Sequence, residues 1–193
     1  MSGHDSESAR TQREKVEKTR PMKAYLSENA FMGLVVSSAE VFKKESLGYL
    51  LGYRLSDRIV VEYAFGLQTA KRRRRGVMFH DRDQKRIEAI LAHFTKLQIV
   101  GDFHSHTPYG AKRGLSVPSR EDIGEMEKDK LYLIIAINES SRSHIWKENK
   151  DGSISGSMGN YFFKISAYYY DEKRDMPWKT FIFCQFPPGL KSG

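Results

Sequence analysis

Short runs of apolar residues, separated by polar segments, predict a series of β-strands along the chain. A continuous apolar run is typical of a strand buried on both faces, and alternation is typical of a strand buried on one. The strongest run spans residues 131–137 and predicts a central strand. The remaining predicted strands span residues 24–26, 47–53, 58–65, 98–103, 143–147, 161–170 and 181–186.

A second, helical spacing of apolar residues predicts helices between these strands. One helix is expected over residues 28–43, after Ser27 as its N-cap, and another over residues 80–97. A short helix should follow Ser119 and end near residue 128. Because helices and strands are interspersed, we predict an α/β domain in which a mixed β-sheet is packed with helices.

Length and charge patterning fit one domain with flexible ends. The chain has 193 residues, enough to bury a core, and we expect an ordered domain over residues 23–187. Residues 1–22 are polar and charged, which predicts a disordered tail, and residues 188–193 predict a flexible C-terminus. A metal in such a domain is expected to serve catalysis rather than folding.

The cysteine content and the hydropathy of the chain indicate its cellular compartment. Cys184 is the one cysteine, which excludes an intramolecular disulfide and a cysteine-rich zinc site. No apolar run approaches the ~20 residues of a membrane span, and the polar start lacks the apolar region of a signal peptide. We therefore expect a soluble cytoplasmic protein with no membrane partner.

The net charge of +8 and an isoelectric point near 9.5 favour acidic partners. The densest basic cluster is the run of five residues from Lys71 to Arg75. A solvated surface loop accounts for such a run, and docking of an acidic partner or of nucleic acid is the alternative. We do not expect a nucleic-acid partner, because no aromatic side chains are interleaved with the basic ones.

Two histidines follow the predicted strand at residues 98–103 and are the first candidate metal ligands. His104 and His106 are separated by one residue, so in a strand their side chains point to the same face. Neutral imidazole is a preferred ligand of zinc, and two rings on one face converge on one point. A chance pair in a loop is the alternative for this motif alone.

Asp122 is the candidate third ligand. It follows Ser119 by three positions at the start of a predicted helix, where a carboxylate can reach back over the preceding strand end. Ser-x-x-Asp is also close to a capping box, which only satisfies backbone donors of the helix. The neighbouring histidine pair favours the metal interpretation, because two histidines and one carboxylate leave the fourth zinc position open for water.

Glu45 is a candidate proton carrier for such a site. A carboxylate beside an activated water can take its proton and pass it to a leaving amine. Glu45 closely precedes the buried strand at residues 47–53. An ordinary glutamate at a helix end is the alternative, and spacing alone does not decide between the two.

Together these motifs resemble the JAMM (MPN-plus, Mov34/PAD-type) family of zinc metallopeptidases, whose members include isopeptidases that remove ubiquitin and ubiquitin-like modifiers. The resemblance rests on Glu45-Ser-Leu-Gly-Tyr-Leu-Leu-Gly, His104-Ser-His106 and Ser119-x-x-Asp122. It extends over the order of predicted elements from about residue 24 to residue 145. It implies the MPN fold, which is cytidine-deaminase-like.

For this chain the resemblance implies Zn²⁺ held by His104, His106 and Asp122. It implies Glu45 as the general acid and base, and Ser119 as a hydrogen-bond donor to the developing oxyanion. The implied reaction is hydrolysis of the amide bond after the C-terminus of a ubiquitin-like modifier. That modifier, or its conjugates, is the expected partner.

Two features depart from the family pattern. Thr107 stands where members usually have proline, and the segment from His106 to Ser119 is longer than usual. An insertion beside the site affects access of the substrate, and it could cover the metal until a partner moves it.

Other interpretations account for fewer of these residues. The segment from Asp102 to Thr107 also resembles the opening motif of PHP-type phosphoesterases, but His144 is the only histidine that follows it. Zinc deaminases need a Pro-Cys-x-x-Cys motif, which a single cysteine excludes, and the His-Glu-x-x-His signature is absent. The main alternative is a non-catalytic MPN scaffold or assembly subunit, although every polar position of the motif is filled here.

Overall fold

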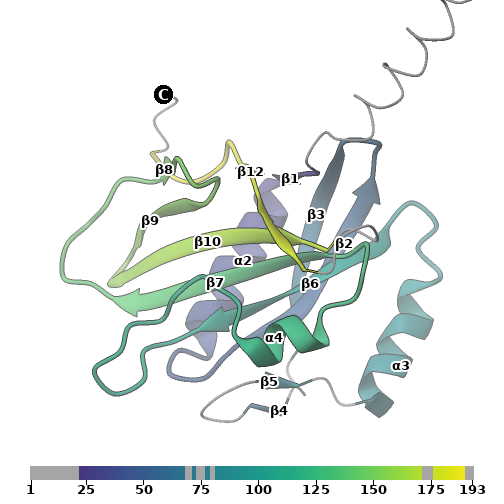
Figure 1. The fold of residues 1–193 in the computed structure, drawn as a ribbon, viewed down its shortest axis with the longest axis horizontal. Helices are drawn as coiled ribbons and strands as arrows, with labels where there is room; N and C mark the ends of the chain where they lie inside the picture. Colours follow the sequence, from purple (N-terminus) through teal and green to yellow (C-terminus); the bar gives the residue numbers. More distant parts are fainter. Residues whose placement is uncertain (1–21, 68–70, 73–76, 79–80, 171–175, 190–193) are drawn as a thin grey trace, which may run out of the picture.

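The chain folds around one mixed β-sheet of ten strands (Figure 1). The computed structural model describes residues 22–67, 71–72, 77–78, 81–170 and 176–189. The strands are β1 (Lys23–Leu26), β2 (Leu47–Arg54), β3 (Arg58–Gly66), β4 (Lys71–Arg72), β5 (Val77–Met78), β6 (Gln98–His106), β7 (Leu131–Glu139), β8 (Lys147–Glu148), β9 (Ile154–Met158), β10 (Tyr161–Tyr169), β11 (Trp178–Thr180) and β12 (Ile182–Phe183). The helices are α2 (Glu28–Glu40), α3 (Asp81–Leu91) and α4 (Arg120–Glu125).

The strand order of the sheet is β12-β1-β3-β2-β6-β7-β10-β9-β8, with β11 paired to β10 outside this path. Strands β4 and β5 form a separate two-stranded sheet. The pairs β1–β12, β1–β3 and β6–β7 are parallel, whereas β2 is antiparallel to both β3 and β6. The sheet is therefore mixed, as predicted, and β6 lies between β2 and β7 near its middle.

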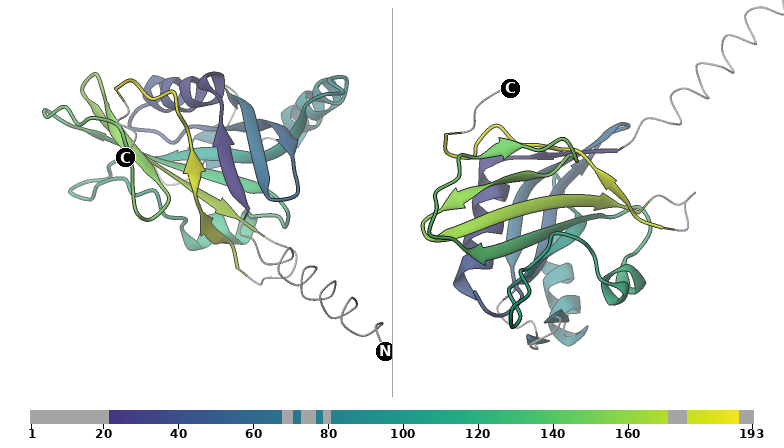
Figure 2. Two further views of the ribbon diagram at one scale, coloured as in Figure 1. Left: turned by 90° about the horizontal axis from the view of Figure 1, so that it is seen from above. Right: turned by 60° about the vertical axis from the view of Figure 1, so that its left-hand side comes forward.

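Helix α2 covers one face of the sheet and contributes to the main core (Figure 2). It begins after Ser27, whose side chain accepts a hydrogen bond from the Ala30 amide at 3.1 Å, as expected for an N-cap. Phe31, Leu34 and Val35 of α2 are buried in one cluster with strand residues of the sheet. Burying an apolar helix stripe on an apolar sheet face is the main stabilising event of this fold.

The prediction of a sheet packed with helices is correct only in part. Among the helices that the structure describes, α2 alone contributes buried residues. Helix α4 has none, and no described side chain of α3 is buried. The domain is mostly strand, with α4 on the sheet face opposite α2 (Figure 2). The helix predicted over residues 80–97 is shorter than expected. Helix α3 ends at Leu91 and lies at the margin of the sheet (Figure 1).

Two glycines, one in β6 and one in β2, allow the central strands to pack closely against their neighbours. A Cβ atom on Gly101 would lie 1.7 Å from the Leu131 carbonyl oxygen of β7. A Cβ atom on Gly48 would lie 2.0 Å from the Phe65 carbonyl oxygen and 2.5 Å from the Phe103 ring. Both sites exclude larger residues, because no side chain can occupy the same space as a neighbouring backbone.

The predictions for the C-terminal half were partly wrong. Residues 143–146 are not in a strand. The chain instead forms the two-residue strand β8 and then β9, which the sequence pattern missed. The run at residues 181–186 shortens to β12, and β11 precedes it. The strand at residues 131–137 is confirmed as β7, which is buried along almost its whole length.

Several sequence expectations lie outside the described residues. Residues 1–21 and 190–193 are not described, so the predicted tails are not tested there. Of the basic run, Lys71 and Arg72 form β4, and residues 73–76 are not described. In the described part of the chain, no helix is long and apolar enough to cross a membrane.

Candidate metal centre

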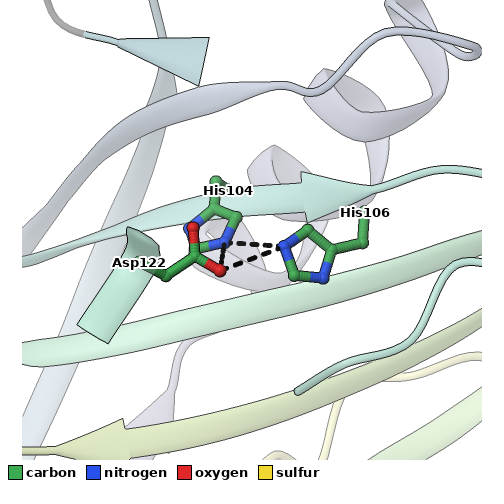
Figure 3. A group of neighbouring side chains, drawn as sticks. All are labelled: His104, His106 and Asp122. Carbon is green, nitrogen blue, oxygen red and sulfur yellow. Dashed lines mark hydrogen bonds and ion pairs between the residues drawn. The ribbon is translucent and has the colours of Figure 1, made fainter. Parts of the chain in front are cut away.

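His104, His106 and Asp122 converge at the C-terminal end of β6 (Figure 3). The two Nε2 atoms of the histidines lie 3.1 Å apart. The Asp122 Oδ2 atom lies 3.5 Å from His104 Nε2 and 3.4 Å from His106 Nε2. The structure therefore brings the three predicted metal ligands together, although sixteen positions separate His106 from Asp122 in the chain.

These separations fit a zinc ion. Tetrahedral zinc with bonds of about 2.0–2.1 Å to nitrogen and oxygen needs its ligand atoms about 3.3–3.4 Å apart. The three observed edges of 3.1, 3.4 and 3.5 Å match that spacing. Two imidazoles and one carboxylate are also a donor set that zinc prefers, and they leave one position for water or substrate. The residues present therefore fit a catalytic type of zinc site.

The histidines reach one point because β6 extends through both of them. Phe103, one position earlier, belongs to the core under α2, so His104 and His106 project from the opposite face. The His106 Nδ1 atom lies 2.7 Å from the Leu115 carbonyl oxygen. A carbonyl can only accept, so Nδ1 carries the proton and the Nε2 lone pair faces the centre.

Asp122 is held by a capping box at the start of α4. Its Oδ2 atom accepts the Ser119 amide at 2.6 Å, and its own amide donates to Ser119 Oγ at 3.1 Å. The capping interpretation of Ser-x-x-Asp is therefore correct, and the same carboxylate oxygen also faces both histidines. Capping and ligation are compatible at this position, because one carboxylate oxygen has two lone pairs.

The charges of the site reinforce one another. Burial works to raise the pKa of Asp122, but hydrogen bonds from the doubly protonated, cationic forms of His104 and His106 and from the Ser119 amide outweigh it and hold that pKa well below its usual range. Burial works to lower the pKa of His106. The Asp122 carboxylate, the Leu115 carbonyl and the charge of Glu45 outweigh it and raise that pKa. The carboxylate is thus kept ionised, which is the form that binds a metal.

Glu45 lies beside His106 across the pairing of β2 with β6. Just beyond the paired end of β2, the Ser105 amide donates to the Ser46 carbonyl at 3.0 Å. Because the two strands are antiparallel, the next pair along is Glu45 and His106. Glu45 is half-buried and is not one of the three clustered ligand residues. It therefore stands next to the centre rather than in it, where the sequence predicted a proton carrier.

The segment between His106 and Ser119 has two parts. Residues 109–112 form a tight turn, in which the backbones of Tyr109 and Lys112 exchange hydrogen bonds of 2.9 and 3.1 Å. Residues 114–116, which we call the strap, lie against the sheet next to His106. The additional length of the segment thus forms the turn at residues 109–112, and the strap that follows it lies against the sheet.

Three side chains of the sheet anchor the strap. Asn138 of β7 is buried and binds both backbone groups of Gly114, at 2.9 Å to its amide and 3.0 Å to its carbonyl. Ser166 Oγ lies 2.9 Å from Ser116 Oγ, and the Tyr168 hydroxyl donates to the Ser116 carbonyl at 3.0 Å. The strap carbonyl that faces His106 is therefore held from both sides.

Asn138 and the acidic residue Asp102 are neighbours of the site that the sequence did not predict. Asp102 shares the His104 face of β6, and it pairs across the sheet with Tyr49 and Tyr132. Burial raises the pKa of Asp102 to about 7, against the opposing charges of His104 and Lys130. Strand alternation predicts that residue 102 shares a face with residue 104, so a signal for Asp102 was present in the sequence.

The chain belongs to the prokaryotic homologs of the JAB domain, because the sequence model of that family matches residues 27–149. This confirms the resemblance to the JAMM/MPN family, and the fold is a JAB/MPN domain with a mixed sheet and few helices. The fold is similar to the solution structure of protein DSY2949 from Desulfitobacterium hafniense, with a TM-score of 0.57 and 17% identity over 84% of this chain and 92% of that chain. A comparison with curated proteins found no match.

Proposed function

We propose that this protein is a zinc-dependent peptidase that hydrolyses the amide or isopeptide bond after the C-terminus of a ubiquitin-like modifier. The triangle of ligand atoms from His104, His106 and Asp122 is the observation that carries the proposal. Membership of the JAB family supports the reaction class, since that family includes metallopeptidases. The choice of modifier conjugates as substrate rests on the resemblance of the motifs.

The donor set would hold zinc through two imidazoles and one carboxylate. A zinc ion there would supply a Lewis acid for the scissile carbonyl and lower the pKa of an attacking water toward ~7, from about 15.7 in bulk. Glu45 would take the proton of that water and deliver it to the leaving amine, because the register of β2 and β6 puts it opposite His106 and its charge acts on that imidazole.

Ser119 would stabilise the oxyanion that develops on the attacked carbonyl. Its hydroxyl oxygen accepts the Asp122 amide, so the hydroxyl proton is directed elsewhere and can be donated. A donor aimed at a developing oxyanion is worth roughly 10²–10³ in rate in other hydrolases. The same residue would thus serve the helix cap and the reaction.

Zinc content tests the metal centre first. Untagged protein, purified without chelators, should contain about one zinc per chain by elemental analysis. The His106→Ala variant should contain almost none, while Lys112→Ala, on the neighbouring exposed turn, should match the wild type. No zinc in the wild type, even after reconstitution, would reject the peptidase and favour a non-catalytic MPN scaffold.

Turnover tests the role of Glu45. A screen of ubiquitin-like conjugates and of short peptides should find a substrate that the zinc-loaded wild type cleaves. Glu45→Gln should retain zinc and lose at least ~10²-fold in turnover, because it removes the proton carrier and leaves the ligands. Full turnover by Glu45→Gln would exclude Glu45 as general base.

A further inference from the structure

Three buried serines form a chain of contacts beneath the metal centre, on the side covered by α2. Ser38 belongs to the last turn of α2, Ser46 precedes β2, and Ser105 stands between the two histidines of β6. Their exposed fractions are 0%, 2% and 0%. Buried hydroxyls require partners, so three of them in contact define a specific arrangement of the backbone.

Ser105 binds both backbone groups of Ser46. Its Oγ atom accepts the Ser46 amide at 2.8 Å, and its own amide donates to the Ser46 carbonyl at 3.0 Å. Behind Ser46, the Ser38 hydroxyl donates to the Leu34 carbonyl at 2.8 Å and lies 3.5 Å from Ser46 Oγ. The residue after Glu45 is therefore connected to the strand that carries both histidines and also lies against α2.

The regular sheet does not position Glu45. Helix α2 ends at Glu40, and the chain then turns through residues 41–44, where Lys43 has a left-handed φ of 77°. Glu45 follows this turn and precedes the first residue of β2. The two hydrogen bonds of Ser105 to Ser46 extend the pairing of β2 with β6 by one position, which reaches the neighbour of Glu45.

We propose that Ser105 is a positioning residue, which fixes the Glu45 carboxylate beside the metal centre through its hydrogen bonds to the Ser46 backbone. The proposal rests on the proposed function, because it assigns a role in the same reaction. Without the Ser105 hydroxyl, the buried Ser46 amide loses its acceptor and the segment must move toward water. A displacement of about 1 Å in a catalytic group can lower a rate by ~10².

Three variants test this role by kinetics. Ser105→Ala should lower kcat by ~10–100-fold, with KM within about threefold and zinc content unchanged. Ser105→Thr retains a hydroxyl and should restore most of kcat, whereas Ser153→Ala, which removes a buried hydroxyl from the β8–β9 connection, should match the wild type. A loss of zinc in Ser105→Ala, or a rise in KM alone, would overturn the proposal.

A double-mutant cycle identifies the residue through which Ser105 acts. In a Glu45→Gln background, Ser105→Ala should produce no further loss of kcat, because the group that it positions is already removed. A full additional loss in that background would show that Ser105 acts through the metal ligands or through folding, and would overturn the proposal.

Amide hydrogen exchange tests the contact without any activity. In the wild type the Ser46 amide should be protected, and Ser105→Ala should accelerate its exchange at least ~10-fold while the amides of β7 keep their protection. If the wild type is inactive on every substrate, the proposed function fails, and the exchange result alone then decides whether Ser105 holds this segment. Unchanged protection of the Ser46 amide in Ser105→Ala would overturn the proposal in either case.

Discussion

Ser119 and Asp122 hold each other through two hydrogen bonds. The Ser119 amide donates to Asp122 Oδ2 at 2.6 Å, and the Asp122 amide donates to Ser119 Oγ at 3.1 Å. The same Oδ2 atom faces His104 and His106. The helix cap thus orients a carboxylate for a metal centre, in the way that hydrogen bonds behind a ligand fix its geometry.

Removal of the Ser119 side chain should weaken both the cap and the metal centre. Ser119→Ala should lower the free energy of unfolding by about 0.5–2 kcal/mol and zinc affinity by ~10–100-fold. Ser119→Asn retains a good cap but no hydroxyl, so it should keep zinc affinity and lose turnover. Chelator competition measures the affinities. If Ser119→Ala bound zinc with wild-type affinity, the helix cap would not contribute to metal binding.

Asp122→Asn should reduce zinc affinity strongly, whereas a change at the adjacent Glu121 should not. The amide is close in size and can still accept the Ser119 amide, but it lacks the negative charge that zinc prefers. Glu121→Gln is the matched control, because Glu121 is an exposed acid of the same helix turn. Elemental analysis after dialysis should find zinc in the control only. Full occupancy in Asp122→Asn would remove Asp122 from the ligand set.

Asn138 should affect the metal centre from a distance, through the strap. Asn138→Ala leaves the backbone of Gly114 without its two partners, which should cost about 1–3 kcal/mol of stability. The Leu115 carbonyl would then hold His106 less firmly, so zinc affinity should fall ~10-fold. Asn149→Ala removes a comparable side chain from the β8–β9 connection and should leave zinc affinity unchanged.

Asp151, in the turn between β8 and β9, forms ion pairs with Lys164 and Lys179 whose contribution to stability should be lost in acid. Burial works to raise the pKa of Asp151, but hydrogen bonds from Lys179, Ser153 and Lys164 outweigh it and keep that pKa below its ordinary value of 3.8. A carboxylate whose pKa is lowered by folding contributes stability that is fully present above its ordinary pKa. This stability is lost as the pH falls from the ordinary pKa toward the lowered one.

The comparison of zinc-free wild type with Asp151→Asn by urea unfolding tests this cluster. The wild type should be the more stable protein at pH 6, and its advantage should shrink as the pH falls below 3.8. A difference between the two proteins that is independent of pH would mean that the charge of Asp151 does not stabilise the fold.

The sequence pattern predicted the elements whose apolar residues are continuous or regularly spaced. Strand β7 is one case, because its apolar run is buried between β6 and β10. Strand β9 was missed because it reads Ile-Ser-Gly-Ser-Met, in which polar Ser155 occupies a buried position. Asn149 binds Ser153 and Ser155 there, and Gly156 gives room to the Trp146 ring. Such compensation depends on tertiary neighbours, which a local pattern does not contain.

The sequence by itself determined the ligand types and the face on which two of them lie. Side chains of a strand alternate between its two faces, and this alternation depends only on the local backbone. His104 and His106 therefore share a face because their segment is a strand. The spacing of Ser119 and Asp122 was local as well, and Asp122 was assigned as a ligand because the histidine pair precedes it.

Only the tertiary structure decided which groups hold these residues in place. The contact between Ser46 and Ser105 spans 59 positions of the chain, and that between Gly114 and Asn138 spans 24. Both contacts exist because β6 lies between an antiparallel β2 and a parallel β7. Hydrogen bonds between distant segments follow from strand order, and strand order is settled by the burial of the whole apolar face rather than by any short motif.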